Sequence, residues 1–282
     1  MKKKSYPIWG GIYPPIVFYL LNVVVQIVVV LVLKICHVNI NNYLSPVALA
    51  SLLIADGIAL PFLIWLRYSD TKKGFNNCVE FENTFIPKYI LIIPFAMFVT
   101  LSANTIVSIL QRFMPAFMAH SYDDTAKGIF GSGPILTIVT VVIVGPIVEE
   151  LLFRGLMYSR FKRVMGPAIG GLISSILFGI YHLNWLQAPY AFIIGMCLVF
   201  VYERYKSLGA CFLFHCTANC IVTVPILLMK NSDIASTFGQ QTQSPGLTVL
   251  LPLCLLYSFA AAIFGLVIFI VVQPKRIKAG VK

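Results

Sequence analysis

The sequence predicts an all-α, polytopic membrane protein with about eight transmembrane helices. Its 282 residues are 59% hydrophobic and 11% charged, whereas a soluble domain carries roughly 25% charged residues. The mean hydropathy is +0.89, and apolar windows long enough to cross a bilayer recur along the whole chain. Because no long polar stretch could build a soluble domain, we expect residues 1–282 to form a single integral membrane domain.

Eight windows of about 20 apolar residues define the predicted helices. The N-terminal window is too long for the apolar part of a signal peptide and lacks a small-residue cleavage site, so we expect it to remain as the first membrane helix. The fifth and sixth windows are short, which predicts tilted or re-entrant segments there. In chain order the windows are 12–33, 45–66, 87–110, 134–159, 168–183, 188–203, 208–229 and 248–273.

Basic residues predict the orientation of these helices. Most lysines and arginines stand before the first helix, in every second loop, and after the eighth helix. The positive-inside rule then places both termini in the cytoplasm. A lysine-rich chain without targeting extensions is consistent with a bacterial plasma membrane.

The same loops explain the formal charge of +11. We expect membrane lipids as partners but no nucleic acid, because no basic face is interleaved with aromatic residues. The sequence gives no indication of the oligomeric state.

The fourth predicted helix carries Glu149, Glu150 and Arg154, and residues 134–158 contain no other charge. Charged side chains within a bilayer cost several kcal/mol and are usually functional. Glu150 and Arg154 are four residues apart, acid first, which favours an ion pair. Glu149 points about 100° away and has no partner in its own helix, so it is the candidate general base. Pro146 is expected to kink this helix or to begin a new segment.

Two more polar pairs fall on the fifth and seventh predicted helices. Phe178 and His182 share one helical face, and so do His215 and Asn219. Each pair alone is ambiguous, because Asn in a membrane helix often bonds to a neighbouring helix. Together the motifs suggest amide hydrolysis, in which Glu149 takes a proton from water, His182 orients that water, and His215 with Asn219 holds the oxyanion.

Three short sequences resemble the CAAX prenyl protease and bacteriocin-processing family, also called CPBP or Abi. They are EELLFRG at 149–155, FGIYH at 178–182 and HCTAN at 215–219, in this order on successive polar helices. The resemblance covers roughly residues 134–229, which we therefore expect to be the catalytic core, on predicted helices four, five and seven.

The resemblance implies an intramembrane endopeptidase similar to the Ras-converting endopeptidase, acting near the C-terminus of a prenylated (CAAX-type) or other membrane-associated peptide. In this family, residues matching Glu149 and His182 activate water, and those matching His215 and Asn219 form the oxyanion hole. Supporting roles are expected for Glu150, Arg154 and Phe178.

No cofactor is expected, although Glu149, His182 and His215 could instead hold zinc. The metal-free mechanism is preferred because Asn219 is a poor zinc ligand and a good oxyanion donor. Two other functions stay open. One is a proton-coupled transporter, which the mid-helix acid Asp56 slightly favours. The other is a non-catalytic bacteriocin-immunity or scaffold protein of the same fold.

Overall fold

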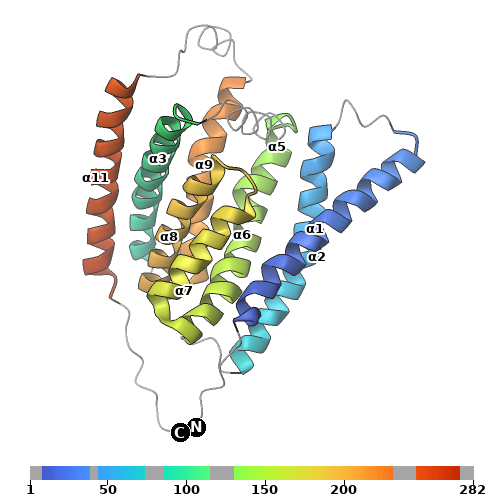
Figure 1. Ribbon diagram of the computed structural model, residues 1–282, viewed down its shortest axis with the longest axis horizontal. Coiled ribbons are helices and arrows are strands. Elements are labelled where there is room, and N and C mark those ends of the chain that lie inside the picture. The colour runs from blue at the N-terminus through green and yellow to red at the C-terminus, as the bar shows by residue number, and fades with distance from the viewer. Residues whose placement is uncertain (1–7, 39–43, 74–85, 115–129, 231–245, 274–282) are drawn as a thin grey trace.

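A helix lies at each of the eight predicted places in the computed structural model (Figure 1). The structure describes residues 8–38, 44–73, 86–114, 130–230 and 246–273, and within these ranges it contains helices but no strand. The predicted all-α class is therefore confirmed. The long helices are α1 (Trp9–Ile35), α2 (Leu44–Lys72), α3 (Ile92–Gln111), α7 (Ser159–Tyr181), α8 (Gln187–Tyr205), α9 (Leu208–Lys230) and α11 (Leu247–Val271), and a short 3₁₀ turn, η2 (Ile86–Leu91), precedes α3.

The fourth predicted helix, over 134–159, is not a uniform α-helix. It alternates between α-helical and π-helical pieces: α5 (Pro134–Thr137), η3 (Ile138–Val144), α6 (Gly145–Glu150) and η4 (Leu151–Tyr158). Short π-helical segments inside α-helices occur frequently at functional sites. The sequence predicted a kink or a new segment at Pro146, and α6 does begin there. The π-helical form was not predicted, and the residues around Pro146 explain it.

Pro146 has no backbone N–H and stands in the first turn of α6. The N–H of Gly145, just before it, bonds to the Thr140 carbonyl, five residues back, in the π-helical pattern. A Cβ atom at Gly145 would lie 2.8 Å from that carbonyl oxygen, so only glycine permits the approach. Pro146 thus begins a new α-helical piece within a continuing helix.

The fourth and fifth predicted helices are joined by a break at Gly166. This residue has φ 82° and ψ 170°, a conformation that glycine adopts without the steric cost of a side chain. Pro167 follows it and resumes the helix. Figure 1 shows the chain descending through α6 and rising again through α7.

The composite fourth helix lies at the centre of the bundle. Its segment η4 packs against α1, α2, α7, α8 and α9, while α11 packs mainly on α3. Its side chains Leu152, Phe153 and Leu156 have no solvent-exposed surface. Polar residues on α6 and η4 are therefore surrounded by other helices.

Six segments of the described chain are long and apolar enough to cross a membrane. Their exposed surfaces are apolar, as on α11, where Leu255 and Phe259 are open to the surroundings. The chain is therefore an integral membrane protein. Helix α8 is not among the six, and the fourth and fifth predicted helices are counted as one run. The six are Trp9–Ile35, Pro46–Lys72, Lys88–Gln111, Pro134–Tyr181, Leu208–Met229 and Leu247–Val271.

A buried ion pair fastens α7 to the first two helices. Arg160 Nε lies 2.8 Å from Asp70 Oδ2 on α2, and Arg160 Nη1 donates to the Gly10 carbonyl on α1 at 2.6 Å. Both charged side chains are almost fully buried. Removing one partner of such a pair leaves an uncompensated buried charge, which costs about 3–5 kcal/mol.

We therefore expect Arg160→Met to lower the stability of the bundle by about 3–5 kcal/mol, because Asp70 loses its counter-charge. Thermal unfolding of the detergent-purified protein measures this. The exposed Lys73, replaced by Met, serves as the control and should leave the melting temperature nearly unchanged. Equal melting temperatures for wild type and Arg160→Met would contradict the assignment.

Candidate active site

Glu150 is the centre of a fully buried polar network. Its Oε1 accepts a hydrogen bond from Arg154 Nη1 at 2.8 Å and another from His215 Nδ1, also at 2.8 Å. Arg154 Nη2 reaches across to the Gly195 carbonyl on α8 at 3.2 Å. The side chains of Glu150 and Arg154 are both 0% exposed. The ion pair predicted from the spacing is present, and the network joins α6, η4, α8 and α9.

Glu149 occupies a different environment one residue earlier. Its side chain is 21% exposed, and its Oε2 lies 3.7 Å from His215 Nε2. Because His215 Nδ1 donates its hydrogen to Glu150, a neutral imidazole presents Nε2 as an acceptor. Two acceptors at 3.7 Å are too far apart for a direct hydrogen bond. A water molecule beside both atoms could donate one hydrogen to each.

His182 ends α7 and is held by the backbone. Its Nδ1 lies 2.8 Å from the Phe178 carbonyl, which can only accept, so Nδ1 carries the hydrogen and Nε2 is left for another partner. The following turn is fixed by Asn184, whose Oδ1 accepts from the backbone N–H groups of Leu186 and Gln187. Sequence reasoning missed Asn184, although Asn just before a helix is a recognisable capping signal.

Phe178 packs against both imidazoles. Its ring makes edge-to-face contacts with His182 at 4.9 Å and with His215 at 5.8 Å between centroids. The Arg154 guanidinium lies 4.6 Å from the same ring centroid, in the range of a cation–π contact. Of the two imidazoles, His215 is the one that approaches Glu149, whereas the sequence predicted His182 as its water-orienting partner.

Asn219 donates from Nδ2 to the Val141 carbonyl at 2.8 Å. In a regular helix the Val141 carbonyl would accept from the backbone N–H four or five residues later. Here the Gly145 N–H bonds to Thr140 instead, and Pro146 has no N–H. Asn219 therefore supports the π-helical segment η3. An amide group has two hydrogens, so one remains for an oxyanion.

The alternative of a zinc site was predicted on Glu149, His182 and His215. Within the residues that the structure describes, no three His, Cys, Asp or Glu side chains are grouped so as to hold a metal ion. His182 Nδ1 bonds to a carbonyl and His215 Nδ1 bonds to Glu150, so Nε2 of each ring is left for another partner. The metal-free mechanism stays a prediction.

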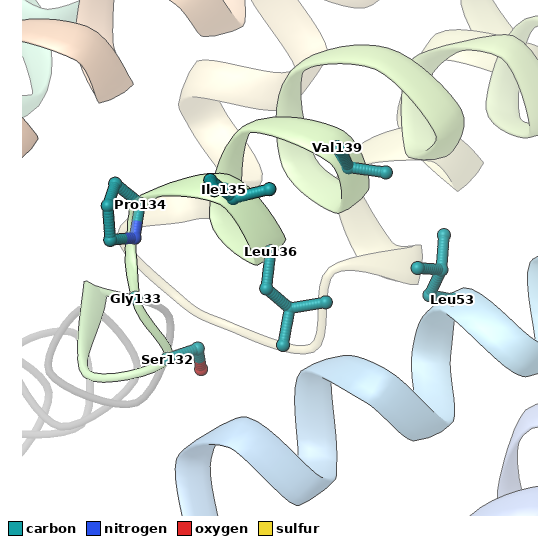
Figure 2. Close-up of a pocket in the computed structure, with 7 residues that line it drawn as sticks. All are labelled: Leu53, Ser132, Gly133, Pro134, Ile135, Leu136 and Val139. Carbon is teal, nitrogen blue, oxygen red and sulfur yellow. The ribbon is translucent and has the colours of Figure 1, made fainter.

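An open, apolar pocket of about 490 Å³ lies between α2 and the start of the composite helix (Figure 2). Figure 2 shows Leu53 on α2 across from Leu136 and Val139. None of the candidate catalytic residues lines it. The lining residues are Leu53, Ser132, Gly133, Pro134, Ile135, Leu136 and Val139.

Residues 131–221 match a family model described as "Type II CAAX prenyl endopeptidase Rce1-like". This segment contains Glu149, His182, His215 and Asn219. Through this segment, the chain is similar to the Rce1-like family. The resemblance predicted from the three short motifs is thereby confirmed.

Two curated bacterial proteins are similar to parts of this chain. "Putative membrane peptidase YdiL" of Bacillus subtilis (strain 168) is 32% identical over 89 residues, which are 32% of this chain and 36% of that protein. "UPF0177 protein YbdJ" of Lactococcus lactis subsp. lactis (strain IL1403) is 25% identical over 179 residues, or 60% of this chain and 74% of that protein. The match to YdiL thus spans about a third of its length. No solved structure matches the chain.

The two adjacent acids should differ in their effect on stability. Glu150→Gln leaves the buried Arg154 without a counter-charge, so we expect a loss of about 3–5 kcal/mol. Glu149→Gln changes a partly exposed carboxyl group and should cost less than about 1 kcal/mol. Thermal unfolding in detergent compares the two variants. Equal losses of stability in the two variants would contradict the assignment of Glu150 as a structural carboxylate and of Glu149 as one that is free to react.

Proposed function

We propose that this membrane protein is an intramembrane, glutamate-dependent endopeptidase. Its substrate is a prenylated (CAAX-type) or other membrane-associated peptide, cut near the C-terminus. The observation that carries the proposal is the position of the Glu149 carboxylate, partly exposed and 3.7 Å from an imidazole nitrogen. The match of residues 131–221 to the Rce1-like family model supports the same reaction class.

In the proposed reaction Glu149 is the general base. It takes one proton from a water molecule, whose oxygen forms a bond to the carbonyl carbon of the scissile peptide bond. The carbonyl electron pair moves onto oxygen and gives a tetrahedral oxyanion. When that intermediate collapses, the C–N bond breaks and the proton held by Glu149 passes to the leaving amine. The glutamate returns to its ionised form.

The two histidines and the asparagine orient these groups in our proposal. His215, with its tautomer set by the hydrogen bond to Glu150, shares the water with Glu149. His182 has its Nδ1 bonded to the backbone, so its Nε2 is an alternative acceptor for the second hydrogen of that water, in place of His215 Nε2. Asn219 donates one amide hydrogen to Val141 and the other to the oxyanion.

A proton-coupled transporter fits the described residues less well. Several polar side chains on the first three helices bond to carbonyls of their own helix, as Asn22 does to Phe18 and Ser51 does to Val47. Side chains bonded in this way do not line a path across the bilayer. A non-catalytic scaffold or immunity protein is separated from the peptidase by the next experiment, because its activity would survive the loss of Glu149.

Glu149→Gln should lower kcat about 10²- to 10⁴-fold, since the amide cannot accept the proton of water. The assay follows cleavage of farnesylated and unmodified peptides by the detergent-purified protein. His37→Gln, at an exposed position, is the control and should retain wild-type turnover. Unchanged turnover in Glu149→Gln would end the proposal.

A metal chelator should leave kcat/KM unchanged, because the proposed base and oxyanion donors are all side chains. The test incubates the purified protein with 1,10-phenanthroline before the cleavage assay. Inhibition that added Zn²⁺ reverses would instead favour the zinc mechanism.

A further inference from the structure

Asp56 is a buried acid that the proposed reaction does not use. It lies on α2, its exposed fraction is 2%, and its Oδ2 is buried without a hydrogen-bond partner. Asp70, further along the same helix, is equally buried but paired with Arg160 at 2.8 Å. An unpaired carboxyl group is costly to bury in protein or membrane. Asp70 is buried in an ion pair that stabilises the fold, whereas Asp56 is buried without one. This difference indicates that Asp56 has a role other than stabilising the fold.

Asp56 faces the candidate active site. Helix α2 packs against α6, and Asp56 and Glu149 are close enough to repel one another electrostatically. Tyr181, next to His182 at the end of α7, interacts electrostatically with both acids. Three polar groups from α2, α6 and α7 therefore face a common region.

The interface between α2 and the composite helix is also open to the surroundings. Leu53, one helical turn before Asp56, lines the apolar pocket between α2 and α5. Asp56 does not line this pocket, and its carboxyl group is buried one turn further along α2.

A peptide that enters the membrane in an extended form loses the water that solvated its N–H groups. Each of those groups then needs a new acceptor. The carbonyl oxygen of a carboxyl group accepts a hydrogen bond whether or not the group is ionised. Asp56 offers this chemistry beside Glu149, where the bond to be cut must lie.

We propose that Asp56 is a substrate-binding residue that accepts a hydrogen bond from an N–H group of the bound peptide, next to the bond that Glu149 hydrolyses. The inference rests on the proposed peptidase function. The donor is a backbone amide or a basic side chain of the substrate, and the experiment below distinguishes these sources.

The test compares Asp56→Leu, which has the same branched shape and no acceptor, with Asp56→Asn, which keeps one acceptor oxygen. For a farnesylated CAAX-type peptide, we expect Asp56→Leu to raise KM about 10- to 100-fold with little change in kcat, and Asp56→Asn to restore part of the loss. Ser51→Ala is the matched control, because the Ser51 hydroxyl bonds to its own helix, and its KM should equal that of wild type.

Thermal unfolding separates binding from a structural role. Removing an unpaired buried acid should leave the melting temperature unchanged or raise it, whereas Asp70→Leu should lower it. A lower melting temperature for Asp56→Leu, with KM unchanged, would overturn the proposal.

Two altered peptides identify the donor. If a basic side chain donates, replacing it with norleucine abolishes the difference between wild type and Asp56→Leu. If a backbone amide donates, replacing that amide bond of the peptide with an ester abolishes the difference. A difference that survives both changes at every position would also overturn the proposal.

The affinity for a fluorescein-labelled peptide, measured without turnover, tests the binding role of Asp56 separately from the peptidase activity. Should the wild-type protein cleave no peptide, the peptidase proposal fails, while an Asp56-dependent loss of affinity would still support the binding role. Should cleavage occur with equal affinity for wild type and Asp56→Leu, only the present inference fails.

Discussion

The buried contact among Glu150, Arg154 and His215 is the interaction on which the site depends. Three polar groups that would each be costly in a low-dielectric interior are neutralised and hydrogen-bonded by one another. Because they come from α6, η4 and α9, satisfying them fixes how three helices approach. The bond from Arg154 to the Gly195 carbonyl extends the same constraint to α8. The bundle thus acquires a defined arrangement where apolar packing alone would allow several.

The same contact determines the chemistry available to the neighbouring acid. Glu150 uses its carboxylate to hold Arg154 and His215, whereas Glu149, rotated by about 100° along the helix, keeps its carboxylate partly exposed. The hydrogen bond from His215 Nδ1 to Glu150 sets the tautomer, so Nε2 faces Glu149 as an acceptor. One acid orients the imidazole, and the other shares water with it in the proposed reaction.

Local spacing predicted the fold class, the places of the helices and the ion pair between Glu150 and Arg154, because each depends on hydropathy or on contacts within one helix. Contacts between helices were harder to predict from the sequence. The sequence assigned His182 to the water and His215 to the oxyanion, and these roles stay predictions. It did not predict that His215 Nε2 lies 3.7 Å from Glu149 Oε2. That contact depends on how α9 packs against α6, and residue spacing does not encode packing between segments.

The irregular fourth helix shows a similar limit. Pro146 predicted a disturbance, yet the π-helical form of η3 depends on Gly145 tolerating the Thr140 carbonyl and on Asn219, 78 residues away, bonding to Val141. Asp56 was recognised as unexplained from the sequence, but its position relative to Glu149 required the packing of α2 on α6. The cytoplasmic placement of the termini and the bacterial plasma membrane remain predictions.

The central claim is that water, activated beside Glu149, attacks the peptide bond directly. A single-turnover cleavage in water enriched in ¹⁸O, followed by mass spectrometry of the product and the protein, tests it. Direct attack predicts one ¹⁸O atom in the new carboxylate of the product during the first turnover. An unlabelled first product, with ¹⁸O found in the side chain of Glu149, would show that the glutamate forms a covalent acyl intermediate and would contradict the account.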